Sequence, residues 1–365
     1  MDKMRSDVIG SLLRPEYLKK AIQRVEAGEL EDTEFKQIED RAVDEALELQ
    51  LRSGTDVVTD GEMRRYAFFG HFVNSVEGFD KLGGKQITYR NESGEEHTYA
   101  RPVVVESLKP QRHLCAEEFT YLRARLGKSE KTIKSTIINA QQAASYYEPE
   151  KSRDAYRSVD AYMADVVDIL RREVEELIRL GCKYIQVDAP QYAALLDPGV
   201  RRMYQDRGID PDRAIDMCIE RDNAIVKGLS GAVFGIHLCR GNNQSKFYAS
   251  GGYEFIARKL FRNIQFDRFL LEYDDKRSGG FEPLKEIPED RTAVLGLVTT
   301  KTGILEDADD LKNRIAEAER YIPRERLALS TQCGFASVIE GNMLTVEEEE
   351  SKLRLIAETA KEVWG

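Results

Sequence analysis

The tripeptide His237-Leu238-Cys239 carries the clearest metal-binding chemistry in the sequence. It follows the apolar run AVFGI, which predicts a β-strand that ends here. In an extended chain, residues i and i+2 point to the same side, so both side chains can reach one metal ion. A buried histidine beside a core cysteine would give the same pattern. Further ligands are needed to distinguish a metal site from packing.

Two more ligand types stand at equivalent places, Glu272 at the end of the run FLLEYDD and Cys333 after the run LALST. Strand ends converge on one rim of a closed barrel, so residues far apart in sequence become neighbours there. Asp274 and Asp275 are alternative carboxylates. The predicted Zn²⁺ ligands are His237, Cys239, Glu272 and Cys333, a set that zinc accepts at about 2.0 to 2.3 Å.

The composition of this ligand set favours thiol chemistry over hydrolysis. Hydrolytic zinc sites usually keep neutral histidines and an open position for water. Two thiolates and a carboxylate would nearly neutralise or overcompensate the charge of Zn²⁺. Such a site is poor at acidifying water, yet it can bind an incoming thiol as a thiolate. We therefore expect a zinc-bound thiolate that attacks an electrophilic carbon.

Other predicted strand ends supply candidate catalytic and substrate-binding groups. Ser11 follows the first strand, Glu62 the second and Asp188 the fourth. The two carboxylates could hold an ammonium group and Ser11 a carboxylate, which together describe an amino-acid thiol. Alternatively, the carboxylates pair with the arginines of the segment TDGEMRR. Lys301, after the seventh strand, is a candidate contact for an anion or a leaving group.

The remaining cysteines are expected to be structural. His113-Leu114-Cys115 repeats the metal-binding tripeptide, but it lies at a predicted helix start, where positions i and i+2 diverge by about 200°. Cys182 precedes the fourth strand and Cys218 lies inside a helical pattern. The five cysteines do not form a disulfide framework, so reduced thiols are expected.

Short β-rich runs alternate with amphipathic helical stretches along the chain, which predicts parallel strands joined by crossover helices. The predicted strands are 7–12, 55–60, 131–138, 184–189, 232–239, 268–274, 292–298 and 327–331. The predicted helices include 33–52, 159–180, 211–229, 252–262, 307–320 and 345–363. Eight strands close a barrel, so we predict an α/β fold of the (β/α)₈ TIM-barrel type, formed as a single catalytic domain over residues 1–365.

An insertion over about residues 66–128 follows the second strand. Residues 86–106 predict a β-hairpin around the turn sequence NESG, and a helix is expected to start near Ala116. Because βα loops emerge on the C-terminal face of a barrel, the insertion should cover the mouth of that barrel.

The composition indicates a small-molecule partner. The formal charge is −11 and no long basic block is present, which argues against nucleic acid and anionic membranes as partners. No apolar run approaches the roughly 20 residues that cross a bilayer, and no signal core opens the chain, so a cytoplasmic protein is expected. The sequence leaves the oligomeric state open, a homo-oligomer included.

Seven motifs occur in an order that resembles a known family: IGSLLRP, DVVTDGEMRR, YIQVDAPQY, GIHLCRGN, FLLEYDD, GLVTTKT and STQCGFAS. The set is similar to the catalytic barrel of cobalamin-independent methionine synthase, and more closely to short bacterial proteins that consist of that barrel alone. The resemblance implies that zinc is held by the four predicted ligands, with Glu272 yielding its place when substrate sulfur arrives. It also implies that Ser11, Glu62 and Asp188 contact homocysteine, which is methylated to methionine.

The residues that would serve the methyl donor differ from those of full-length relatives. Full-length relatives carry a tryptophan after the third strand and a histidine after the seventh, and both serve the folate and proton transfer. Here these exits are INAQQ and VTTKT, and the only tryptophan is Trp364. The donor is therefore methyltetrahydrofolate or another methyl compound.

Three other functions compete with methyl transfer to homocysteine. One is zinc-dependent alkyl transfer to another thiol, as in epoxyalkane:coenzyme M transferases. Another is a metal-free decarboxylase of the uroporphyrinogen decarboxylase type, whose chemistry needs no thiolates. The third is a binding module with a closed structural zinc, although such sites favour short CxxC spacing within one small element.

Overall fold

Eight parallel strands form the centre of the protein. The computed structural model describes residues 4–90, 96–206, 208 and 210–365. The strands follow the order β1-β12-β11-β10-β9-β8-β7-β2, and all neighbouring pairs are parallel. Their bounds are β1 Ser6–Asp7, β2 Val57–Val58, β7 Thr132–Ile138, β8 Tyr184–Asp188, β9 Val233–Leu238, β10 Arg268–Glu272, β11 Thr292–Val298 and β12 Leu327–Thr331.

Hydrogen bonds between the two end strands nearly close the sheet into a barrel. The backbone N–H of Asp56, just before β2, donates to the carbonyl of Ser6 at 3.2 Å and to its hydroxyl at 2.8 Å. In return, the Asp56 carboxylate accepts from the backbone N–H groups of Arg5 and Ser6, each at 2.9 Å. The predicted (β/α)₈ barrel is confirmed, and each of the eight predicted runs overlaps one strand, although β1 begins before its run and shares only Asp7 with it.

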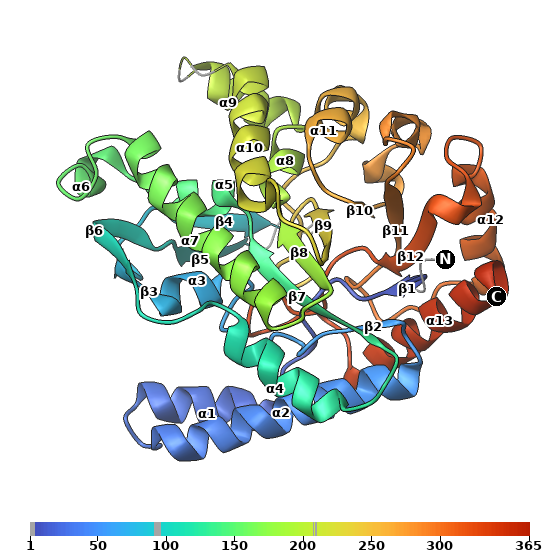
Figure 1. Cartoon of the computed structure of the whole chain (residues 1–365), viewed down its shortest axis with the longest axis horizontal. Coiled ribbons are helices and arrows are strands. Elements are labelled where there is room, and N and C mark those ends of the chain that lie inside the picture. Colours follow the sequence, from blue (N-terminus) through green and yellow to red (C-terminus); the bar gives the residue numbers. More distant parts are fainter. Residues whose placement is uncertain (1–3, 91–95, 207, 209) are drawn as a thin grey trace.

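Helices surround the barrel (Figure 1). The α-helices are α1 Glu16–Glu26, α2 Asp32–Ser53, α3 Gly70–Ser75, α4 Ala116–Leu126, α5 Ala140–Ala144, α6 Pro149–Ser152, α7 Val159–Arg179, α8 Pro190–Ala194, α9 Pro198–Asp206, α10 Pro211–Val226, α11 Ala257–Asn263, α12 Ala308–Ala318 and α13 Val346–Trp364. Short 3₁₀ turns are η1 Tyr253–Phe255, η2 Lys276–Ser278, η3 Glu282–Glu286 and η4 Arg324–Arg326. The predicted helix 252–262 is divided between η1 and α11.

Local capping explains where several helices begin. Ser158 accepts a hydrogen bond from the N–H of Ala161 at the start of α7. Thr345 and Glu348 form a reciprocal capping box at the start of α13. None of the described helices is both long and apolar enough to span a membrane.

The insertion after β2 contains two antiparallel ribbons where the sequence predicted one hairpin. Strands β4 (Gln86–Arg90) and β5 (Glu96–Ala100) form the expected hairpin, and its predicted turn NESG lies outside the described residues. The end of the predicted hairpin instead belongs to β6 (Val103–Pro110), which pairs with β3 (Val76–Asp80). Gly78, at φ +113°, permits this pairing because a Cβ atom there would lie 2.8 Å from the Glu106 carbonyl. Helix α4 begins at Ala116, as predicted.

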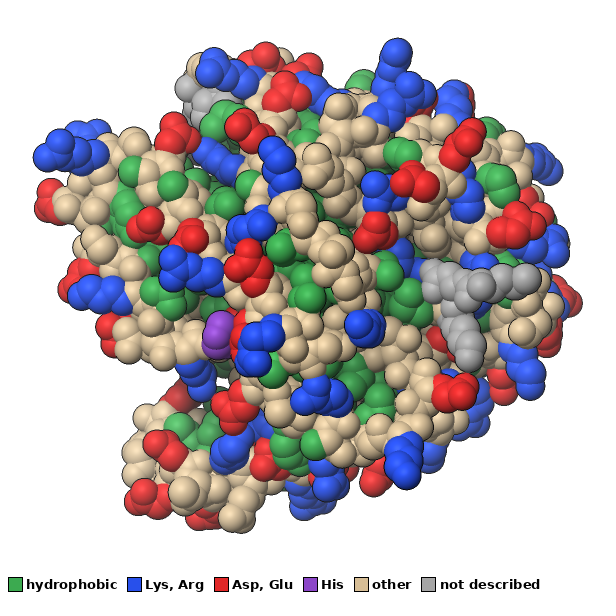
Figure 2. All heavy atoms as spheres, in the orientation of Figure 1, with side chains coloured by type: hydrophobic (Ala, Val, Ile, Leu, Met, Phe, Trp, Pro, Cys, Tyr) green, Lys and Arg blue, Asp and Glu red, His purple; other side chains and the backbone are tan. Residues whose placement is uncertain are grey.

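The interior of the barrel combines a small apolar group with buried charges. Ile9, Leu270, Val294 and Ala328 pack together inside it, separately from the main apolar cluster between sheet and helices. Outside, on the face shown in Figure 2, positive and negative side chains are interspersed. This mixture gives that face no large basic surface of the kind that nucleic acids need.

Candidate metal centre and its cavity

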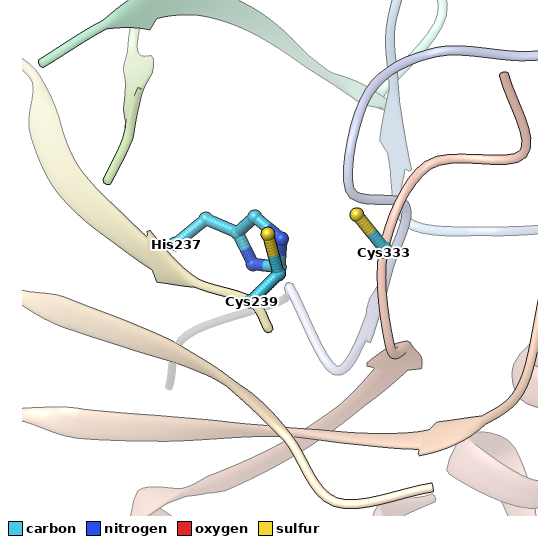
Figure 3. Close-up of side chains that lie close together, drawn as sticks. All are labelled: His237, Cys239 and Cys333. Atoms are coloured by element: carbon cyan, nitrogen blue, oxygen red, sulfur yellow. The ribbon is translucent and has the colours of Figure 1, made fainter. Parts of the chain in front are cut away.

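Three of the four predicted ligands meet at the C-terminal rim of the barrel (Figure 3). His237 lies in β9, Cys239 follows that strand directly, and Cys333 follows β12. Their potential ligand atoms all lie within 4.8 Å of one another, and all three residues are buried. The i, i+2 spacing predicted from the sequence therefore directs both β9 side chains toward the sulfur of Cys333.

The three side chains fit a tetrahedral metal ion. Two ligands held at about 2.0 to 2.3 Å from such an ion lie roughly 3.3 to 3.8 Å apart, which small side-chain movements would reach here. His237 Nδ1 lies 3.2 Å from the carbonyl of Leu270 and must donate to it, because a carbonyl can only accept. Its Nε2 is buried and has no hydrogen-bond partner within the described part of the chain. A metal at Nε2 would satisfy this atom.

The electrostatics of the centre also suit a cation. A hydrogen bond from Cys333 lowers the pKa of the Cys239 thiol well below its ordinary value, and His237 lowers it further. The same hydrogen bond, together with burial, raises the pKa of Cys333. Burial alone would lower the pKa of His237, but the adjacent Cys239 sulfur and nearby carboxylates outweigh burial and raise it. The hydrogen bond between the two sulfurs thus favours the thiolate form of Cys239.

Glu272, the fourth predicted ligand, is not part of the three-residue group. It lies at the end of β10 and is fully buried. Its Oε2 accepts from the backbone N–H of Arg240 at 2.6 Å, and its Oε1 accepts from Lys301 Nζ at 3.2 Å. Glu272 is still close enough to raise the pKa values of His237 and Cys333. The structure therefore holds this carboxylate beside the centre, with both oxygens engaged.

Lys301 pairs with acidic side chains of the protein itself, whereas the sequence suggested a contact with an anion or a leaving group. Its ammonium group pairs with Glu272 and with Asp274, at 2.9 Å in the second case. Lys301 is absent from the described lining of the cavity next to the centre. Asp275, the other alternative carboxylate, pairs with Arg277.

A cavity of about 1060 Å³ opens onto the three ligands. Its inner wall includes the predicted substrate-binding residues Ser11, Glu62 and Asp188. Phe68, Phe69, Lys85 and Arg101 of the insertion line its outer part. Residues of the insertion thus contribute to the cavity wall on this side of the barrel.

Glu62 has one carboxylate oxygen that accepts hydrogen bonds and one that has no partner among the described residues. Its Oε1 accepts from Thr136 Oγ1 at 2.6 Å and from Arg65 Nη1 at 3.3 Å. Its Oε2 is buried without a hydrogen-bond partner. The backbone of Glu62 has a φ of +54°, and Arg14 donates to its carbonyl at 2.9 Å. Glu62 therefore pairs with Arg65, as one of the two predictions had it, while its role toward a substrate ammonium group stays a prediction.

Asp188 lies next to His237 across the β8–β9 pair. Its Oδ1 accepts from Gln186 Nε2 at 2.7 Å. Burial, with a smaller contribution from Glu62, raises the pKa of Asp188 to about 7, although His237 opposes the shift. Two buried carboxylates that disfavour each other's charge would favour a cation such as an ammonium group between them.

Sequence reasoning missed the polar network that joins the rim loops. Asn342 Nδ2 donates to Asn242 Oδ1 at 2.8 Å and to the Thr300 carbonyl at 2.9 Å. Asn242 Nδ2 in turn donates to the carbonyl of Gly334 at 2.6 Å, next to Cys333. The position of Asn242 within the segment CRGNN, just after a ligand, was the available signal.

The repeated His-Leu-Cys tripeptide does not join the metal centre. His113 Nδ1 lies 3.0 Å from Glu173 Oε2 of α7, and the backbone N–H groups of Leu114 and Cys115 donate to the same carboxylate, each at 2.7 Å. These contacts attach the start of α4 to α7. Cys182 and Cys218 are buried core residues, as predicted.

The chain is similar in sequence to a known protein family and to several of its relatives. The sequence model of the family described as "Cobalamin-independent synthase, Catalytic domain" matches residues 4–362. Bacillus subtilis YxjG, an uncharacterized protein, is 36% identical over 365 residues, which cover 99% of this chain and 94% of that protein. A methionine synthase of Saccharolobus solfataricus is 24% identical, with coverage of 94% and 96%.

A solved structure agrees with the fold. The putative vitamin-B12 independent methionine synthase from Listeria monocytogenes superimposes with a TM-score of 0.76 at 26% sequence identity. The match covers 99% of this chain and 98% of that one. The barrel fold is therefore shared over nearly the whole length of both chains.

Proposed function

Because the chain belongs to the family of cobalamin-independent synthase catalytic domains and is similar to proteins described as methionine synthases, we propose that it is a zinc-dependent methyltransferase. In this proposal it methylates homocysteine to methionine. The observation that carries this proposal is the meeting of an imidazole nitrogen and two sulfurs at the floor of a cavity that also exposes two carboxylates.

His237, Cys239 and Cys333 are the residues that would hold the ion. Glu272 lies beside them, and it could serve as a further ligand only after releasing Arg240 or Lys301. When bound, zinc would lower the pKa of an incoming thiol, so that its sulfur stays nucleophilic at neutral pH.

The cavity residues would orient an amino-acid thiol. The free oxygen of Glu62 and the carboxylate of Asp188 would accept hydrogen bonds from its ammonium group. Ser11, whose Oγ accepts weakly from the Ala336 N–H at 3.4 Å, can donate to the substrate carboxylate. The sulfur then attacks the methyl carbon, a carbon–sulfur bond forms, and the electron pair of the broken bond stays with the donor.

The donor is proposed as methyltetrahydrofolate or another methyl compound. Gln141 and Gln142 follow β7, the third strand of the barrel, and line the cavity. Full-length relatives carry a tryptophan after this strand. An amide cannot offer the same stacking surface as an indole ring. This difference supports testing several donors rather than one.

Alkyl transfer to a different thiol is the nearest alternative. Coenzyme M carries a sulfonate and no ammonium group, so Glu62 and Asp188 would repel it rather than bind it. A metal-free decarboxylase would not need the buried group of His237, Cys239 and Cys333. The described cavity therefore favours homocysteine over both.

Metal analysis of the purified chain and of two variants, Cys239→Ser and Cys333→Ser, tests the metal centre. Wild type should hold zinc near one equivalent, and both variants should lose most of it. Cys218→Ser is the matched control, because Cys218 is an equally buried cysteine in α10 away from the rim. Zinc-free wild type, or a rim variant with full activity, would refute the proposal.

A panel of substrates tests the reaction. Homocysteine, coenzyme M and glutathione should each be combined with methyltetrahydrofolates, methylcobalamin, S-methylmethionine and epoxides. We expect methionine to form from homocysteine with at least one methyl donor. Product only from another thiol or from an epoxide would replace homocysteine methylation by the alternative alkyl transfer.

A further inference from the structure

A buried group of charged and polar side chains lies inside the barrel beneath the cavity. Asp7 of β1 accepts from Lys134 Nζ of β7 at 2.7 Å through Oδ1. Its Oδ2 accepts from the Tyr184 hydroxyl at 2.9 Å and lies 3.7 Å from Arg268 Nη2. All four side chains are almost completely buried. We call these four residues the interior charge network.

Stability alone does not account for this network. Barrel interiors are ordinarily filled by branched apolar side chains. Removing two charges from water costs about as much as their attraction returns, so apolar replacements of buried ion pairs are often neutral or stabilising. In the barrel interior, the layer that contains Gln186 separates the network from Asp188 of the candidate site. The hydrogen bonds of the network show whether it reaches the candidate site.

Gln186 connects the network to the site. Its Oε1 accepts from Lys134 Nζ at 2.7 Å. Its Nε2 donates to the Ile9 carbonyl and to Asp188 Oδ1, both at 2.7 Å. Gln186 is fully buried, so neither end of its amide can exchange partners with solvent.

The charge of Lys134 determines which way this amide faces. An ammonium group only donates, so the oxygen end of Gln186 must face Lys134. The NH₂ end must then face Asp188, where it holds Oδ1. Among the described residues, none donates a hydrogen bond to Asp188 Oδ2, and Asp188 lines the cavity.

We propose that Gln186 and Lys134 are positioning residues that orient Asp188, so that one carboxylate oxygen is fixed in the barrel and the other faces the ammonium group of the amino-acid thiol. The inference rests on the proposed function, because it assigns Asp188 to that ammonium group. Burial lowers the pKa of Lys134, and Asp7 opposes this shift by pairing with the ammonium group at 2.7 Å. The Tyr184 hydroxyl donates to Asp7 and has no described hydrogen bond to Gln186 or Asp188, so Tyr184 is outside the positioning path.

The test compares binding of two thiols to the zinc-loaded chain by calorimetry. Homocysteine carries the ammonium group, and 4-sulfanylbutanoate is the same molecule without it. Gln186→Met removes the donor to Asp188 and keeps the Lys134–Asp7 pair. We expect its Kd for homocysteine to rise about 10-fold, the effect of losing a hydrogen bond to a charged group, with the Kd for the desamino thiol nearly unchanged.

A second variant tests Lys134 by removing it together with Asp7, its partner in the ion pair. The double variant Asp7→Asn/Lys134→Met removes both members of the ion pair, so the Gln186 amide is no longer fixed by a cation. Its preference for homocysteine over the desamino thiol should fall as it does in Gln186→Met. Tyr184→Phe is the matched control, because it alters the same network outside the path and should keep the wild-type preference.

Three results would overturn the inference. Gln186→Met or the double variant could retain the wild-type ratio of the two Kd values, or Tyr184→Phe could reduce the ratio equally, which would indicate a purely structural role. Failure of the proposed function has a different signature, since wild type itself would then show no preference for homocysteine.

Discussion

Asn342 offers a direct test of how the rim loops hold the metal centre. Its Nδ2 donates to Asn242 and to the Thr300 carbonyl, and its Oδ1 accepts from the Ser245 N–H at 2.8 Å. These partners belong to the loops after β9 and β11, while Asn342 lies in the loop after β12. One buried amide therefore joins three loops, two of which carry the cysteines of the centre.

Truncation to alanine would leave three groups without their partner: the Asn242 side-chain oxygen, the Thr300 carbonyl and the Ser245 N–H. Each lost hydrogen bond at a buried group costs about 1 kcal/mol, so Asn342→Ala should lower the free energy of unfolding by about 3 kcal/mol. Asn242 is also the link to the Gly334 carbonyl beside Cys333. Loss of such outer contacts typically weakens metal binding about 10- to 100-fold.

Two measurements separate these effects. Urea unfolding of the metal-free chain gives the change in stability, and competition with a chromophoric chelator gives the zinc affinity. Asn223→Ala is a matched control, because Asn223 makes two similar contacts, to the Asn263 carbonyl at 2.9 Å and from the Gln265 N–H at 2.7 Å, far from the rim. It should lower stability and leave zinc affinity unchanged.

Two results would refute the reasoning. If Asn342→Ala loses about 3 kcal/mol of stability but binds zinc within about 2-fold of wild type, the loops position the cysteines without this network. If it loses neither stability nor affinity, the buried hydrogen bonds do not form as described.

Three further variants give independent tests. Burial raises the pKa of Glu349 to about 8, from an ordinary 4.5, so between these pH values the folded state retains a proton that the unfolded state loses, and wild-type stability falls as pH rises. Over that window, the free energy of unfolding of Glu349→Gln in urea should rise relative to wild type by about 1.4 kcal/mol per pH unit. A difference that is constant with pH would contradict the shift. Thr136→Val removes the 2.6 Å hydrogen bond to Glu62 at nearly constant volume, so the Kd of homocysteine should rise about 10-fold; an unchanged Kd would show that Thr136 does not orient Glu62. His113→Ala should leave zinc content unchanged, because His113 contacts Glu173 and not the centre; loss of zinc would reverse this assignment.

Much of the site follows from the sequence because its causes are local or topological. Alternation of β-rich and amphipathic runs predicted all eight strands and hence a barrel. The i, i+2 geometry of a strand places His237 and Cys239 on one side, and the convergence of strand ends brings Cys333 to them. Neither step requires knowledge of side-chain partners.

Tertiary contacts decided what those rules leave open, since a buried polar group takes whichever partner the fold brings near. The sequence could not show that Arg240 and Lys301 engage Glu272, or that Arg65 and Thr136 hold only one oxygen of Glu62. Competition among such partners is settled by distances of a few tenths of an ångström between residues far apart in the chain. The pairing of β3 with β6 was likewise decided by long-range register, for which the alternating pattern of 86–106 contains no information.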